Sequence, residues 1–214
     1  IPREQLSIPE DRTWVRMVIC QRPFKLDPAF DDMLAQTVKA SWPCKLFILK
    51  DMQLPWATQR GIERLTSVLL RHDVDATQCL VEVPWLGREH FFGLLDEMDI
   101  YLDMPAFSGY TTAWQAVHRG MPIVTLEGEF MRQRLAAGLL RKIEQTETIA
   151  QSEAEYIDIA TRLAEECRDT ELHAKRRAAI KTAAPKADHD VSVVRAFEKT
   201  LIDALAEKIG RAHV

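Results

Sequence analysis

The sequence predicts an α/β protein with a doubly wound, parallel sheet and additional helices at its C-terminal end. Two observations carry this prediction. Five short apolar segments alternate with amphipathic helical patterns up to about residue 143, an order typical of βαβ units. After about residue 151 only helical patterns follow. We therefore divide the chain into a sheet domain, residues 1–150, and a helical extension packed on it, residues 151–214.

Each predicted strand is short, apolar and followed by polar or turn-forming residues. Asp27 and Pro28 begin the first helix in a common way, with aspartate at the cap and proline in the first turn. That helix carries its apolar residues at helical spacing, and so does the helix predicted at 58–73. The strands are predicted at 13–20, 44–50, 79–83, 100–103 and 121–126, and the other helices at 29–41, 87–98, 111–120 and 128–143.

The extension reads as two helical stretches, 152–183 and 188–210, with a loop at 184–188 and Asp190 as a plausible cap. The chain begins with Ile1 rather than methionine, so we expect it to be a piece of a longer protein. The sequence leaves open whether the chain forms a homo-oligomer.

Composition excludes several classes of function. The net charge of −4 and a pI near 5.9 argue against general nucleic-acid binding, which calls for a basic face. No apolar run approaches 18 residues and no signal peptide is visible, so we expect neither a membrane span nor secretion. The four cysteines form no CxxC pair and read as buried thiols in a reducing compartment, which favours a cytoplasmic protein without a zinc site.

Polar residues gather in the loops that follow the strands. In a parallel sheet these loops share one edge, where ligands bind. Lys25, in the first loop, could reach such a ligand, although on its own it is better read as a solvated lysine. His90, at the start of a helix, could stack on a base or move a proton, but alone it is an ordinary first-turn residue. Trp85 is better read as a core or rim aromatic.

The stretch "FSGYTTAW", residues 107–114, joins a buried strand to a helix. It fits either a turn with a helix cap or an anion site, since unpaired amides at a helix start attract phosphate. Gly109 could take a positive φ and allow close approach of a ligand. Thr111 and Thr112 offer hydroxyls and amides where a pyrophosphate would sit. These residues alone do not decide between the two interpretations.

Common catalytic motifs are absent from the sequence. The glycine spacing is neither GxGxxG nor GxxxxGK[ST], and there is no HExxH, GxSxG or EF-hand loop. Glu127 and Glu129 follow the last predicted strand and are read as favourable charge at a helix start. Nothing else in the sequence supports a hydrolase that uses these two carboxylates as a catalytic pair.

Several segments together resemble the C-terminal catalytic half of O-GlcNAc transferases, and more closely the bacterial SPINDLY-like proteins of glycosyltransferase family 41. The resemblance spans about residues 14–165, with its most specific part at 99–138. It implies one Rossmann-like domain of a GT-B pair, whose other half is missing here. The segments are "FKLDP", the "EH" that opens the third helix, "DIYLDMPAFSGYTTAWQAVHRGMPIVTLEGE" and "RLAAGLL".

The resemblance implies a role for each candidate residue. Lys25 matches a catalytic lysine that contacts the donor diphosphate and assists departure of the leaving group. His90 matches a histidine that stacks on the uracil, and Thr111 and Thr112 match a threonine pair at the diphosphate, with Gly109 just before them. The implied reaction is inverting transfer of a sugar, GlcNAc from UDP-GlcNAc, to protein serine or threonine. Neither a metal nor a further cofactor is expected.

Three positions depart from the family pattern. Arg22 replaces a glutamine near the donor phosphate, Tyr110 a histidine beside the diphosphate, and Gln115 the aspartate that binds the ribose. These changes keep two alternatives open: a GDP-fucose-using transferase of the SPINDLY type, and a binding module that has lost catalysis. A GT-B epimerase or phosphorylase and an interaction domain are further rivals. We expect this chain to bind the nucleotide sugar, to meet its protein or peptide acceptor through regions it lacks, and to turn over nothing alone.

Overall fold

The strands form one six-stranded sheet in the order β3-β2-β1-β4-β5-β6. The computed structural model describes residues 14–212 and shows every strand pairing to be parallel. The order reverses between β1 and β4, the arrangement of a Rossmann-like, doubly wound fold, so the predicted fold class is confirmed. The strands are β1 (Val15–Ile19), β2 (Cys44–Leu49), β3 (Leu80–Val83), β4 (Ile100–Leu102), β5 (Ile123–Leu126) and β6 (Ile149–Ala150).

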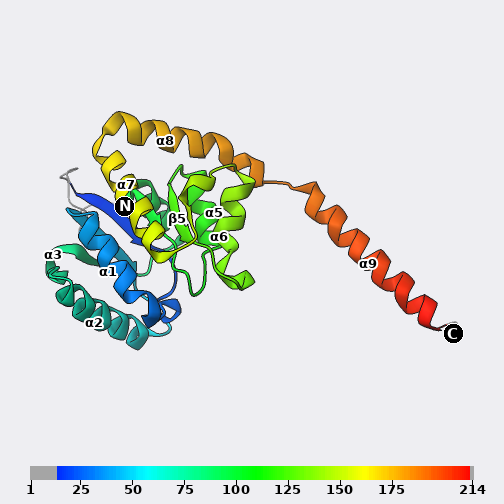
Figure 1. Ribbon diagram of the computed structural model, residues 1–214, viewed down its shortest axis with the longest axis horizontal. Helices are drawn as coiled ribbons and strands as arrows, with labels where there is room; N and C mark the ends of the chain where they lie inside the picture. Colours follow the sequence, from blue (N-terminus) through cyan, green and yellow to red (C-terminus); the bar gives the residue numbers. More distant parts are fainter. Residues whose placement is uncertain (1–13, 213–214) are drawn as a thin grey trace.

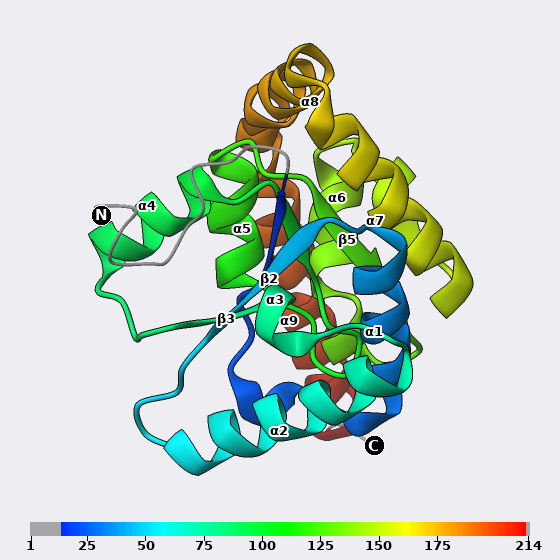
Figure 2. The same ribbon diagram turned by 90° about the vertical axis from the view of Figure 1, so that its left-hand side faces the viewer.

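Helices cover both faces of this sheet. In Figure 2, α1 and α7 lie on one side of the strands and α4 and α5 on the other. This follows from right-handed crossovers, which turn to opposite faces on the two sides of the reversal point. The helices are α1 (Asp31–Ala40), α2 (Pro55–Arg71), α3 (Ala76–Cys79), α4 (Arg88–Glu97), α5 (Thr111–His118), α6 (Leu135–Lys142), α7 (Glu153–Arg168), α8 (Thr170–Ala183) and α9 (Val191–Ala212).

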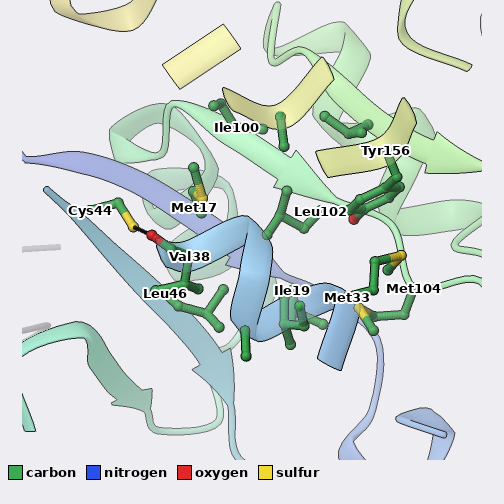
Figure 3. Close-up of a cluster of buried hydrophobic side chains, with 14 of the residues drawn as sticks. Met17, Ile19, Met33, Val38, Cys44, Leu46, Ile100, Leu102, Met104 and Tyr156 are labelled. Atoms are coloured by element: carbon green, nitrogen blue, oxygen red, sulfur yellow. Dashed lines mark hydrogen bonds between the residues drawn. The ribbon is translucent and has the colours of Figure 1, made fainter. Parts of the chain in front are cut away.

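Alternate residues along the strands lie in two separate hydrophobic cores, one on each face of the sheet. Met17 and Ile19 of β1 face the core formed with α1, α2 and α7, whereas Val18 faces the core formed with α4, α5 and α6. Figure 3 shows the first core, in which Met33 and Val38 of α1 lie over the sheet. Because both faces are covered, the strands are mostly apolar and do not alternate regularly with polar residues.

The predicted elements match the structure with several differences. The short helix α3 was not predicted, and the helical stretch predicted at 152–183 is divided at Asp169 into α7 and α8. The two-residue strand β6 was not predicted, since it is too short to give a pattern. Residues 128–134 do not begin the helix predicted at 128–143; they form a loop and the 3₁₀ turn η4 (Met131–Gln133), and α6 starts only at Leu135. Asp27 does act as a cap, accepting the Ala29 amide at 3.0 Å, but it caps the 3₁₀ turn η3 (Pro28–Phe30) ahead of α1.

The helical extension packs on the sheet only in part. Tyr156, Ile159 and Leu163 of α7 are buried in the first core, and Ile180 of α8 is buried in the second. By contrast, α9 extends away from the body of the molecule (Figure 1). Every side chain from residue 192 to residue 208 is exposed. The expectation that residues 151–214 pack on the sheet is therefore wrong for α9, because no other described element covers its apolar side chains. Residues 1–13 of the predicted sheet domain lie outside the described part.

None of the helices within residues 14–212 is long and apolar enough to cross a membrane.

Candidate functional site

The loops after β1 and β4 meet where the strand order reverses. β1 and β4 are neighbours, yet their helices leave for opposite faces, so the carboxyl ends of the two strands open outward. Two contacts join the loops: the Lys25 Nζ lies 3.8 Å from the centre of the Phe107 ring, and Gln21 Nε2 donates to Asp103 Oδ1 at 2.5 Å. The structure therefore brings Lys25 and the "FSGYTTAW" stretch together, as the sequence predicts.

A cavity of about 660 Å³ opens beside this meeting point, a size typical of small-molecule sites. Loops after three strands and the starts of two helices line it. Arg22 comes from the loop after β1, Asp51 from the loop after β2, and Trp85 from the loop after β3. Thr112 and Gln115 of α5 form another wall, so two of the predicted residues on this helix line the cavity. Trp85, predicted as a core or rim residue, lies 61% exposed on the rim.

Lys25 ends the 3₁₀ turn η2 (Pro23–Lys25) and is half-buried. Burial lowers the pKa of its ammonium, and the nearby charge of Arg22 lowers it further. Within the described chain no carboxylate pairs with Lys25. A partly desolvated cation next to another cation is stabilised by any anion that binds between the loops.

Arg22 is already engaged by the protein. Its Nε and Nη2 donate to the two oxygens of Asp51 at 2.6 and 2.8 Å, and Nη2 also reaches Gln53 Oε1 at 3.0 Å. Hydrogen bonds from Arg22 lower the pKa of Asp51 to about 2. The guanidinium therefore joins the loops after β1 and β2, and its predicted phosphate contact stays a prediction.

The start of α5 has no side-chain cap. Tyr110 occupies the cap position without capping, so the first amides of the helix, those of Thr111 to Ala113, have no acceptor within the helix. Thr111 is exposed and makes no side-chain hydrogen bond within the described chain. Thr112 Oγ1 is 2.8 Å from the Tyr101 hydroxyl, which fixes its orientation. Of the two interpretations of this stretch, the arrangement favours an anion site over a capped turn.

Gly109 is needed for a different reason from the one predicted. Its φ is not positive; Gly120 alone among the described glycines has a positive φ, at 73°. A Cβ on Gly109 would instead lie 2.2 Å from the Tyr101 hydroxyl oxygen and 3.0 Å from Thr112 Oγ1. Glycine is required here because the loop packs directly on the Tyr101–Thr112 hydrogen bond.

The remaining predicted residues lie around a second hollow or outside both. Tyr110 is 57% exposed, stands edge-on to Trp114 with ring centres 6.4 Å apart, and lines a neighbouring hollow of about 460 Å³ with Thr111. Gln115 lines both spaces. His90 is exposed on the first turn of α4 and lines neither, whereas Arg88 of the same turn lines both. The predicted stacking role of His90 stays a prediction.

Glu127 has a structural role that its sequence position did not reveal. It accepts hydrogen bonds from Arg134 Nε at 2.8 Å and from Arg141, and these bonds lower its pKa to about 2. The carboxylate thus secures the segment between β5 and α6. Among the described residues, no group of three or more His, Cys, Asp or Glu side chains is placed to hold a metal ion.

The model of the family described as "Glycosyl transferase family 41" matches residues 2–192. The chain belongs to glycosyl transferase family 41. The resemblance proposed from the sequence motifs is therefore confirmed.

Two curated family 41 relatives share parts of the sequence. A UDP-N-acetylglucosamine–peptide N-acetylglucosaminyltransferase from Caenorhabditis elegans is 27% identical over 164 residues, 75% of this chain and 13% of that protein. A probable transferase of the same description from Petunia hybrida, SPINDLY, is 32% identical over 111 residues, 51% of this chain and 12% of that protein. The chain thus spans about an eighth of the length of these relatives.

A solved structure extends the likeness to nearly the whole fold. The K341M mutant of Thermobaculum terrenum O-GlcNAc transferase superposes with a TM-score of 0.78 at 25% identity. The match covers 94% of this chain but 38% of that one. More than half of that family 41 enzyme therefore has no counterpart in this chain.

Proposed function

We propose that this chain is the nucleotide-sugar-binding domain of a protein O-glycosyltransferase, which transfers GlcNAc from UDP-GlcNAc to serine or threonine hydroxyls. One observation carries the proposal: Lys25, which lacks a carboxylate partner in the described chain, faces the loop leading into the uncapped start of α5, beside a cavity large enough for a nucleotide. The names of the family 41 relatives support UDP-GlcNAc as the donor and a peptide as the acceptor.

The chemistry follows from where charge develops. As the glycosidic bond breaks, negative charge grows on the leaving diphosphate. The ammonium of Lys25, the first amides of α5 and the hydroxyl of Thr111 are donors in that region, and they would stabilise the charge without a metal ion. An acceptor hydroxyl attacks from the opposite face of the sugar, which inverts the anomeric centre.

The acceptor and its deprotonation belong to parts of the enzyme outside this chain. This chain corresponds to 38% of the bacterial O-GlcNAc transferase, so we expect it to bind the donor and to lack transferase activity alone. A cytoplasmic location belongs to the same proposal. It is supported by the four cysteines, all unpaired, which suit a reducing compartment.

A GDP-fucose-using transferase is the second candidate. Gln115 lines the cavity where the family pattern has an aspartate, so the contact with the nucleoside differs from that pattern. Arg88, beside Gln115 in both hollows, adds a donor that could favour another base. A module that binds the donor without catalysis is the third candidate, since it requires the same cavity.

Calorimetric titration of the chain with UDP and with GDP tests the proposal. We expect UDP to bind, and Lys25→Ala to weaken binding by about tenfold, the typical loss for one charge-assisted contact. Lys39→Ala is the matched control, because Lys39 is an exposed lysine of α1 that pairs with Asp73 and lies outside the loops after β1 and β4. Preference for GDP would favour the fucose-type donor. Equal binding by the Lys25→Ala variant would contradict the assigned role of Lys25.

A further inference from the structure

Asp103 is a fully buried carboxylate at the carboxyl end of β4. Its exposed fraction is 0%, and it follows directly after the last residue of the strand. Burying a charge is costly unless hydrogen bonds and counter-charges replace water. Asp103 has no cationic partner within the described chain, so its surroundings must stabilise it through neutral donors alone.

Four neutral donors converge on this carboxylate. Gln21 Nε2 and the Gly109 amide donate to Oδ1 at 2.5 and 2.7 Å. The hydroxyls of Ser108 and Thr125 donate to Oδ2, each at 2.7 Å. These donors come from three segments: the loop after β1, the loop after β4, and β5 itself. Asp103 is therefore the point at which the two loops of the candidate site are joined.

The hydrogen bonds continue outward from Ser108. Its hydroxyl accepts the Ala136 amide at 2.9 Å, and its own amide donates to the Arg132 carbonyl at 2.8 Å. Ser108 thus connects Asp103 to the start of α6. On the other face, the Tyr156 hydroxyl donates to the backbone carbonyl of Asp103 at 3.3 Å. The loop between β4 and α5 is held from both sides at this residue.

Among residues 14–212, no cationic side chain pairs with the carboxylate. The titratable groups that interact with it are Cys20 of the loop after β1, Tyr101 of β4 and Tyr156 of α7, all neutral at pH 7. The amide of Gly109 stands two residues before Thr111, the first residue of α5. Whatever fixes Gly109 therefore fixes the direction in which the helix amides point.

We propose that Asp103 is the positioning residue for the donor diphosphate, because it holds the start of α5 and the loop that carries Lys25 in register. The inference rests on the proposed function, since it assigns a ligand to that helix start. Asp103 itself touches no substrate. It acts through Gly109, Ser108 and Gln21.

Two substitutions that each remove one hydroxyl from the same oxygen test this role. Ser108→Ala removes a bond from the loop to Asp103, together with the bond that the same hydroxyl accepts from the Ala136 amide, whereas Thr125→Val removes a bond of equal length to Asp103 from a strand that belongs to the sheet. We expect both to lower stability, but only Ser108→Ala to weaken UDP binding, by about fivefold to tenfold. We expect Thr125→Val to leave the affinity within about twofold of the unchanged protein.

Amide hydrogen exchange supplies a readout that does not depend on nucleotide. Without ligand, we expect faster deuterium uptake over residues 104–112 in Ser108→Ala and unchanged uptake there in Thr125→Val. Asp103→Ala should accelerate uptake over both 104–112 and 20–25, since it removes the junction. If Asp103→Ala does not fold, the comparison of Ser108→Ala with Thr125→Val still tests whether Asp103 positions the loop.

Equal effects of Ser108→Ala and Thr125→Val on affinity would overturn the inference, because Asp103 would then act only on overall stability. Unchanged uptake in Ser108→Ala would overturn it as well. If the unchanged chain binds neither UDP nor GDP, the proposed function fails for this chain alone. The exchange rates would then decide by themselves whether Asp103 holds the two loops together.

Discussion

Replacement of Asp103 by asparagine should change how the stability of the protein depends on pH. Burial raises the pKa of Asp103 from 3.8 to about 6, and its four hydrogen bonds offset only part of that effect. The folded protein therefore keeps the proton on this carboxyl at pH values where the unfolded chain has lost it. Stability from this group is fully present below about pH 4 and is lost as the pH rises through about 6.

The magnitude follows from the two pKa values. A rise from 3.8 to about 6 corresponds to about 3 kcal/mol of unfolding free energy. Asparagine has nearly the same shape, does not titrate, and can accept from Gly109 and Gln21 while donating to the two hydroxyls. We therefore expect the unfolding free energy of the unchanged protein, relative to Asp103→Asn, to fall by about 3 kcal/mol between about pH 3 and pH 8.

Urea unfolding of both proteins, followed by tryptophan fluorescence at several pH values, measures this difference. Because the two proteins share all other titratable groups, the contributions of those groups to the unfolding free energy cancel. Glu127→Gln is a suitable control, because the pKa of Glu127 is lowered to about 2 and its contribution should stay constant above about pH 5. A difference for Asp103→Asn that stays flat, or that rises with pH, would refute the reasoning. It would mean that the four donors fully compensate the buried charge.

Two further outcomes follow from the packing. Gly109→Ala should destabilise the protein by about 1–3 kcal/mol in urea unfolding and weaken UDP binding, because its Cβ would lie 2.2 Å from the Tyr101 hydroxyl oxygen; unchanged stability would contradict that contact. Removal of residues 191–214 should leave the unfolding midpoint of the sheet domain unchanged, because the side chains of α9 from residue 192 to residue 208 are exposed; a marked loss of stability would show that α9 packs on the domain.

Most of the fold could be predicted because local sequence patterns are enough to indicate βαβ units. Each buried strand is a short apolar run, and each helix has one apolar face, so the pattern needs no knowledge of distant partners. The exceptions depend on distant partners. The segment after β5 was predicted as helix, but Ser108 binds the Arg132 carbonyl and Arg134 binds Glu127 there, and these bonds hold a loop. The apolar spacing of α9 predicts a buried face that no described element covers.

The candidate site was predictable to a lesser degree. Lys25 and Thr111 were singled out because they follow strands of a parallel sheet, and the resemblance to family 41 then supplied their predicted roles. Side-chain pairing was not predictable: Arg22 and Asp51 are 29 residues apart, and nothing local shows that they bind each other. Asp103 gave a weak signal, a carboxylate at the end of an apolar strand, but its role depends on Gln21, which is 82 residues away.

The distribution of charge explains how one edge of the sheet can hold both a buried carboxylate and an anion site. Asp103 lies within the core, where its charge is met by four neutral dipoles, whereas the ammonium of Lys25 lies at the surface of the same junction without a carboxylate partner in the described chain. If Lys25 paired directly with Asp103, its charge would be neutralised, and only the amides and hydroxyl at the start of α5 would attract a diphosphate. Because the two groups are apart, Asp103 can hold the loop in place while Lys25 remains available for the proposed diphosphate ligand. A substitution that let Lys25 reach Asp103 should therefore weaken nucleotide binding by about as much as Lys25→Ala does, about tenfold, without unfolding the domain.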